Sequence, residues 1–247
     1  MPPSQDSIVD ILAIAAHRDD VEQTCGGTLL AMHAHGWRTG ILDLTQGESG
    51  TRGTAADREA EANAAARILN VTHREALDLP DGNVQNTLEN RLKIASVLRR
   101  LRPRVVILPY WQGRHPDHYT TATLGYESCF LSGLAKVATP TNGEQPLPHR
   151  PFKILYASLY ADVRPTFVVD ITPFAEQRLQ SLLAYRSQYA TQPQGGGLFV
   201  PEEEIRERTF STARHYGLLA GVRYAEPFIQ KEIGLVDDLV TLPVQSI

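Results

Sequence analysis

Short apolar runs alternate along the chain with longer stretches in which polar and apolar residues mix. The apolar runs predict strands at residues 8–16, 39–44, 104–110, 154–159 and 166–171. The first and third runs are almost continuously apolar, which is typical of strands buried on both faces of a parallel sheet. The stretches around them predict helices at 21–35, 57–69, 88–101, 118–135, 173–188 and 202–216.

Strands that alternate with helices indicate an α/β fold. We expect a Rossmann-like, mostly parallel sheet with helices on both faces. Gly36 and Pro103 lie where the first and third helices should end, and Pro173 lies where the fifth should begin. No repeat or linker divides the 247 residues, so a single domain is expected over 1–247.

Composition narrows the possible partners. The chain is 42% hydrophobic and 21% charged with a net charge of −4, as in an ordinary globular protein without bulk attraction to nucleic acid or anionic lipid. No apolar run is long enough for a membrane span, and the first residues do not resemble a secretory signal. Cys25 and Cys129 lack C-x-x-C spacing, which favours two buried thiols and a cytoplasmic protein.

Histidines and carboxylates follow two of the predicted buried strands. His17-Arg18-Asp19-Asp20 comes after the first strand, and His115-Pro116-Asp117-His118 comes after the third. If both strands belong to one parallel sheet, both clusters project from the same edge, where such sheets bind ligands. Either cluster alone could be a helix cap or an ordinary turn. Two clusters in matching places favour a functional site.

The residue types suit metal-assisted hydrolysis of an amide. His17, Asp20 and His118 could bend toward one ion, and catalytic zinc sites usually take three such protein ligands. Asp19 would then stand beside the metal as a general base. His115 remains as a second titratable group facing a developing oxyanion. Its partner would be Asp117, able to hold the ring and to favour its protonated form.

The motifs A-H-x-D-D and H-P-D-H resemble those of the PIG-L/LmbE-like de-N-acetylases, a family of zinc enzymes that act on N-acetylglucosamine derivatives. The segments "LDLTQGESGTRGTAADREAEA", "ILNV", "LDLPDG" and "GLLAGVRYAEPF" are similar to the branch that deacetylates N-acetylglucosaminyl-malate in bacillithiol biosynthesis. The resemblance covers roughly residues 8–230. It implies an amino-sugar substrate and a homo-oligomer, for which a hexamer is one form.

Carried onto this sequence, the resemblance implies one Zn²⁺ per chain, although nitrogen and oxygen ligands would also accept Fe²⁺, Co²⁺ or Mn²⁺. The implied metal ligands are His17, Asp20 and His118; the implied catalytic residues are Asp19 as base, His115 at the oxyanion and Asp117 as the partner that orients His115. Arg58 falls where the family places a substrate-binding arginine, whose planar fork would suit a malate carboxylate. Arg52 and Glu48 are weaker candidates for substrate contact.

Two positions depart from the family pattern. Arg18 replaces the usual proline, so it could point outward or add a substrate contact. Some relatives have an oxyanion-binding tyrosine near positions 198–205, where this chain has Leu198, Phe199, Val200 and Ile205. Oxyanion stabilisation would then rest on zinc and His115, or on a tyrosine from elsewhere in the chain.

Other functions remain open at this point. The same chemistry could serve another acylated amino-sugar, a chitin fragment or a thiol conjugate. A protein of a different class, one that binds sugars without catalysis, would have no need of the spare carboxylate of Asp19. A purely structural interaction protein gives no reason for acidic residues and histidines to gather at strand ends.

Overall fold

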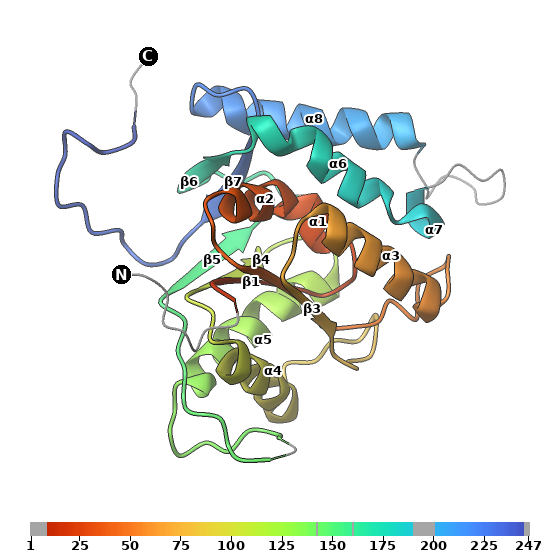
Figure 1. The fold of residues 1–247 in the computed structure, drawn as a ribbon, viewed down its shortest axis with the longest axis vertical. Helices are drawn as coiled ribbons and strands as arrows, with labels where there is room; N and C mark the ends of the chain where they lie inside the picture. Colours follow the sequence, from red (N-terminus) through yellow and green to blue (C-terminus); the bar gives the residue numbers. More distant parts are fainter. Residues whose placement is uncertain (1–8, 142, 160, 190–200, 245–247) are drawn as a thin grey trace.

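A computed structural model describes residues 9–141, 143–159, 161–189 and 201–244 (Figure 1). Its described strands form one seven-stranded sheet in the order β3-β2-β1-β4-β5-β7-β6. The strands are β1 (Ile11–Ala15), β2 (Thr39–Asp43), β3 (His73–Ala76), β4 (Val105–Pro109), β5 (Lys153–Ala157), β6 (Phe167–Asp170) and β7 (Ala225–Ile229). The first five pair in parallel, and β7 runs antiparallel to both β5 and β6. The predicted α/β fold with a mostly parallel sheet is confirmed.

Helices cover both faces of this sheet (Figure 1). They are α1 (Asp20–Thr24), α2 (Gly26–Ala34), α3 (Ala55–Ile68), α4 (Leu88–Leu101), α5 (Pro116–Ser132), a 3₁₀ turn η1 (Thr172–Phe174), α6 (Ala175–Leu183), α7 (Arg186–Tyr189) and α8 (Glu202–Leu219). Helices α4 and α5 lie on one face, and α1, α2, α3, α6 and α8 lie on the other (Figure 1). In the described parts of the chain, no helix is long and apolar enough to cross a membrane.

The alternating side chains of β1 divide the core into two layers. Leu12 and Ile14 belong to the buried cluster that includes α4 and α5, whereas Ile11 and Ala13 pack with Leu29 and other residues of α2. A strand whose two faces are both covered reads as a continuous apolar run. This burial explains why hydrophobicity alone located β1 and β4.

The predicted strands and helices are present, with small shifts at their ends and two helices interrupted. The predicted helix at 21–35 is divided at Cys25 into α1 and α2. The predicted helix at 173–188 is divided into η1, α6 and α7. Strand β3 was not predicted because three of its four residues, His-Arg-Glu-Ala, are polar and all four are half-buried.

Strand β7 was missed because it contains Pro227 and a buried glutamate. Glu226 is 1% exposed, and its carboxylate accepts hydrogen bonds from the backbone N–H groups of Gly27 and Thr28. Both groups lie in the first turn of α2, where a helix leaves N–H donors without internal partners. A glutamate that looks like a surface residue in the sequence therefore caps a buried helix end.

The strand order places the two sequence clusters side by side. Strand β1 pairs with β2 on one side and with β4 on the other, so the strand order reverses at β1. The connection from β1 to β2 crosses the face covered by α2, whereas the connection from β3 to β4 crosses the face covered by α4. This reversal is the crevice in which open α/β sheets bind ligands. Gly125 lets α5 lie close against β4, because a Cβ there would clash with the side chain of Leu108.

Candidate active site

Two short connections bring the candidate residues together at this crevice. Chain leaving β1 passes through His17 and reaches α1 at Asp20. Chain leaving β4 reaches α5, for which His115 is the N-cap and Pro116 the first residue, so that His118 lies in the first turn. Because β1 and β4 are parallel neighbours, both histidine–carboxylate clusters meet at one edge, as the sequence predicted.

Three side chains form a compact triangle of potential ligand atoms. His17 Nδ1 lies 3.2 Å from His118 Nε2 and 3.4 Å from Asp20 Oδ2. His118 Nε2 lies 3.2 Å from Asp20 Oδ1. Zn²⁺ binds nitrogen and oxygen at about 2.0–2.1 Å, which places two tetrahedral ligands about 3.3 Å apart. Each histidine faces a different oxygen of Asp20, and each of the three separations is that of neighbouring protein ligands around one tetrahedral ion.

A second grouping competes with this one. His17, His115 and His118 also offer ring nitrogens that all lie within 4.8 Å of one another. The rings of His115 and His118 are stacked with centroids 4.7 Å apart, and His17 lies edge-on to His115 at the same distance. His17 and His118 are common to both groupings. The third ligand is thus either Asp20, at the shorter distances, or His115.

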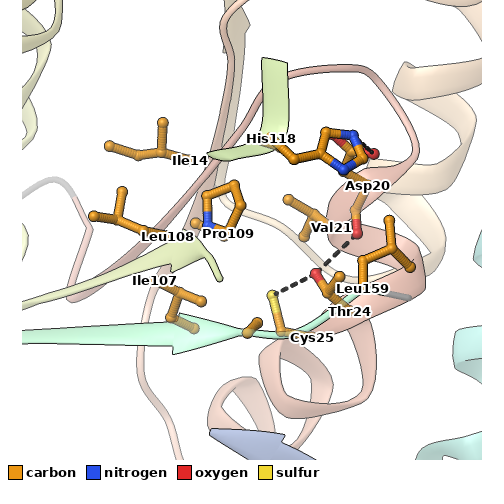
Figure 2. Close-up of a pocket in the computed structure, with 13 residues that line it drawn as sticks. Ile14, Asp20, Val21, Thr24, Cys25, Ile107, Leu108, Pro109, His118 and Leu159 are labelled. Carbon is orange, nitrogen blue, oxygen red and sulfur yellow. Dashed lines mark hydrogen bonds and ion pairs between the residues drawn. The ribbon is translucent and has the colours of Figure 1, made fainter. Parts of the chain in front are cut away.

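The other ring nitrogen of His17 faces two carboxylates. Its Nε2 lies 3.2 Å from Asp117 Oδ2 and 3.2 Å from Asp81 Oδ1. A carboxylate that accepts a hydrogen bond from one ring nitrogen of a histidine fixes the tautomer, and the other nitrogen is then free to bind a metal. In His17 these are Nε2 and Nδ1, respectively. Figure 2 shows Asp20 beside His118.

This geometry corrects the role predicted for Asp117. Its carboxylate accepts hydrogen bonds from the backbone of Gly82 at 2.8 Å and Val84 at 3.1 Å, in addition to facing His17. The contact with His115 is made instead by the Asp117 backbone N–H, which donates to His115 Nδ1 at 3.2 Å. Asp117 lies in the first turn of α5, and its side chain is directed toward the loop after β3 rather than toward the ring of His115.

The side chains around His17 and Asp20 stabilise positive charge. Burial alone would lower the pKa of His17, but hydrogen bonds and charges from Asp20 and Asp81 raise that pKa to about 11. Burial would raise the pKa of Asp20, yet His118 and His17 hold it well below its usual range. A donor set that binds a proton this firmly also suits a divalent cation, which replaces the proton on binding.

Asp19 has a different environment. Its backbone φ is 109°, a left-handed conformation that is costly for a residue other than glycine and that tends to occur at functional sites. Its Oδ2 accepts a hydrogen bond of 2.7 Å from the Tyr189 hydroxyl, and its Oδ1 lies 3.5 Å from the guanidinium of Arg58. Burial raises the pKa of Asp19 to about 7, although Arg58 and Tyr189 act in the opposite direction. A carboxylate with such a pKa suits general base catalysis near neutral pH.

His115 differs from the expected imidazolium. Burial and the neighbouring His17 and His118 lower its pKa, and Asp117 only partly opposes them. Because His115 Nδ1 accepts the Asp117 N–H, the proton of the neutral ring is on Nε2. These contacts correct the prediction of a protonated His115. The ring remains a hydrogen-bond donor on the wall of the cleft.

Both arginines near the site are buried. Arg58 is 5% exposed, donates to the backbone oxygen of Arg18 and lies over the ring of Tyr185. Its Nε is buried without a hydrogen-bond partner among the described residues, and the side chain lines the cleft. Arg18 neither points outward nor reaches the cleft: it is 6% exposed and donates to the Ala55 carbonyl at the start of α3.

The two weaker substrate candidates make contacts within the loops. Glu48 accepts hydrogen bonds from the backbone of Gln46 at 3.2 Å and of Asp81 at 2.8 Å. The backbone oxygen of Arg52 accepts from Gln188 at 2.8 Å. Glu48 thus stabilises the loop in which Asp81 lies close to His17. A substrate contact for Glu48 or Arg52 stays a prediction.

Sequence reasoning missed two residues of the site. Asp81 lies in the segment "LDLPDG", which carried part of the family resemblance but had no assigned role. Tyr189 ends α7 and supplies a tyrosine from outside the region where the family pattern places one. Of that region, 198–200 lie outside the described residues, and Ile205 is buried against Leu179 and Leu182. No local pattern marks Tyr189, because only tertiary packing brings it to Asp19.

The assembled side chains line an open cleft of about 350 Å³. Its wall combines the metal-binding candidates with Asp19, Arg58, His115 and backbone of the glycine-rich loop at Gly47 and Gly50. That volume suits a sugar-sized ligand. A cation site, a carboxylate base and an N–H donor around one cleft can together hydrolyse an amide.

Known proteins resemble this chain over most of its length. The family model PIG-L, described as GlcNAc-PI de-N-acetylase, matches residues 12–129. The diacetylchitobiose deacetylase of Thermococcus kodakarensis is 30% identical over 230 residues, which cover 87% of this chain and 80% of that protein.

Solved structures agree in fold. The conserved protein TT1542 of Thermus thermophilus is 40% identical with a TM-score of 0.81, covering 93% of this chain and 98% of that one. The N,N'-diacetylchitobiose deacetylase of Pyrococcus horikoshii is 27% identical with a TM-score of 0.75, covering 88% and 82%.

Proposed function

Because this chain belongs to the PIG-L/LmbE-like family of de-N-acetylases, we propose that it hydrolyses the N-acetyl amide of an N-acetylglucosamine derivative with the aid of a divalent metal ion. One observation carries the proposal. The side chains of His17, Asp20 and His118 form a triangle in which the nearest donor atoms of each pair lie 3.2–3.4 Å apart. The carboxylate of Asp19 lies beside them and is needed for none of the three ligand positions.

His17, Asp20 and His118 would hold the ion, and Asp117 would orient His17 through its far nitrogen. When bound there, Zn²⁺ would act as a Lewis acid toward the amide carbonyl and lower the pKa of the attacking water. The nitrogen and oxygen donors suit Zn²⁺ without excluding other divalent metals.

Asp19 would accept a proton from the water as its oxygen attacks the acetyl carbon. The Nε2–H of His115 would donate a hydrogen bond to the oxyanion as the carbonyl becomes tetrahedral. Asp19 would then return its proton to the amine nitrogen as the C–N bond breaks, leaving acetate and a free amino-sugar. The hydrogen bond from Tyr189 and the charge of Arg58 would keep the Asp19 carboxylate aimed into the cleft during both transfers.

A more specific part of the proposal concerns the group to which the N-acetylglucosamine is attached. Sequence motifs favour N-acetylglucosaminyl-malate, whereas two relatives are named diacetylchitobiose deacetylases. Arg58 brings the positive charge of its guanidinium to the wall of the cleft, which supports a role for it in binding an anionic or strongly polar group of the substrate. We favour the malate conjugate on that ground and regard a chitin disaccharide as the second candidate.

The test is acetate release from three compounds by protein stripped with a chelator and then loaded with Zn²⁺. The compounds are N-acetylglucosaminyl-malate, N,N'-diacetylchitobiose and free N-acetylglucosamine. Preference for the malate conjugate would support the first candidate, and preference for the disaccharide the second. Metal binding without acetate release from any of the three would contradict the proposed function and favour a protein that binds sugars without catalysis.

A further inference from the structure

A small cavity lies directly beside the candidate metal ligands Asp20 and His118 (Figure 2). Its lining comes from the carboxyl-terminal parts of β1, β4 and β5, from α1 and from Leu159, which follows β5. It is separate from the open cleft described above, but the two cavities share the side chains of Asp20, His118 and Leu159. The small cavity therefore lies on the sheet side of the metal-binding cluster.

The size and chemistry of this cavity suit one small apolar group. Its volume is about 20 Å³, and a cavity needs roughly 10–15 Å³ to hold one water molecule. Val21, Pro109 and Leu159 supply apolar walls (Figure 2). Ala157 also lines the cavity. The Thr24 hydroxyl already donates to the Asp20 carbonyl at 2.8 Å. The other polar side chains of the lining, Asp20 and His118, face one another at 3.2 Å. Since a buried water needs two to four polar partners, the cavity favours a methyl group over water.

Its position matches the geometry of an acyl group. The carbonyl oxygen and the alkyl chain of an amide are attached to the same carbon. A carbonyl oxygen held between His115 and the metal-binding side chains His17 and His118 therefore places the alkyl chain next to that cluster. We propose that this cavity receives the methyl group of the substrate's acetyl substituent and limits the length of acyl chain that the enzyme removes. The inference rests on the proposed deacetylase function and adds the specificity-determining residues Val21, Ala157 and Leu159.

The walls leave little room for a longer chain. Val21 and Ala157 are each 2% exposed, and Cys25 is 1% exposed. Val21 and Cys25 pack against β1 and β4, and Ala157 is the last residue of β5. These three strands cannot move apart without breaking backbone hydrogen bonds. One additional methylene in a pocket of fixed size typically changes specificity by roughly 10- to 200-fold. We expect kcat/KM to fall in the order N-acetyl, N-propionyl, N-butyryl, by roughly 10-fold or more at each step.

The experiment uses whichever of the three compounds named above the wild type deacetylates fastest, in N-acetyl, N-propionyl and N-butyryl forms, as substrates of the metal-loaded wild type and of two variants. Leu159→Ala removes one wall and should raise the butyryl-to-acetyl ratio of kcat/KM by roughly 10-fold or more. Ala157→Val fills the cavity and should lower turnover of the acetyl compound by a similar factor. Leu134→Ala, a change at a half-buried leucine just after α5, is the matched control and should leave the ratio unchanged.

Calorimetric binding of acetate, propionate and butyrate to the same proteins gives a readout that needs no turnover. Tighter binding of acetate by the wild type, with that preference lost in Leu159→Ala, would support the acyl pocket. Equal kcat/KM for all three acyl chains in the wild type would overturn it while leaving the deacetylase function intact. Absence of acetate release would overturn the proposed function, and the binding series would then decide on the pocket alone. If one variant does not fold, as judged by thermal melting, the other variant still decides.

Discussion

The hydroxyl of Tyr189 donates a hydrogen bond of 2.7 Å to Oδ2 of Asp19, a residue 170 positions earlier in the chain. A hydrogen bond to a charged group contributes about 1.5–3 kcal/mol, and this one fixes the direction of the carboxylate. Tyr189→Phe should therefore lower kcat/KM for acetate release by roughly 10-fold or more while metal content stays unchanged. Tyr126→Phe, at a partly exposed position on α5, is the matched control. A rate equal to that of the wild type would show that Tyr189 does not position the base.

Asp19 can be separated from the metal ligands by one substitution. Asp19→Asn keeps the size and part of the hydrogen bonding of the side chain but removes its ability to accept a proton. We expect kcat to fall by roughly 10²- to 10⁴-fold, the usual contribution of general acid–base catalysis. Metal content, measured by mass spectrometry of the protein, should equal that of the wild type. Loss of the metal in this variant would make Asp19 a ligand rather than the base.

The third metal ligand is decided by comparing two variants. If Asp20 completes the triangle with His17 and His118, Asp20→Ala should weaken Zn²⁺ binding by more than the roughly 10- to 100-fold typical of residues that only support ligands. His115→Ala should then retain the metal and lose activity. Titration with a competing chelator measures both affinities. The reverse result would assign the third position to His115.

Substitution of Asp117 tests whether its carboxylate helps His17 to bind the metal. Its carboxylate faces His17 Nε2 and accepts two backbone N–H groups, so Asp117→Asn would place an amide N–H donor where an acceptor is needed. Zn²⁺ affinity should fall by roughly 10- to 100-fold. Asp78→Asn, at a carboxylate whose side chain is 74% exposed, provides the matched control. Unchanged affinity in Asp117→Asn would remove Asp117 from the metal site.

The thiols provide a test of pH dependence. Both cysteines are buried; burial raises the pKa of Cys129 to about 12, and burial together with the charge of Glu226 raises that of Cys25 well above its usual value. Only the thiolate reacts with alkylating reagents, and a raised pKa keeps the thiol protonated as pH increases. Neither should react with iodoacetamide between about pH 7 and about pH 9 in the folded protein, whereas both should react in guanidinium chloride. Labelling of the native protein at about pH 8 would contradict the buried placement.

The sequence by itself determined the layout of the fold and the place of the site. Continuous apolar runs located β1 and β4 because both strands are buried on two faces. Histidines and carboxylates just after these strands indicated one edge of one sheet, since parallel neighbours end at the same side. Patterns of this kind depend on local periodicity and on rules of connection that hold for most α/β sheets.

Only the tertiary structure decided which side chains of the site contact one another. It assigned Asp117 to His17, brought Asp81 from the loop after β3 and placed Tyr189 on Asp19. Hydrogen bonds between distant segments leave no periodic signal, because each partner is a polar residue in a loop or at a helix end. The strand with the buried Glu226 escaped detection for the same reason: the partners that make its burial favourable lie about 200 residues away, at the start of α2.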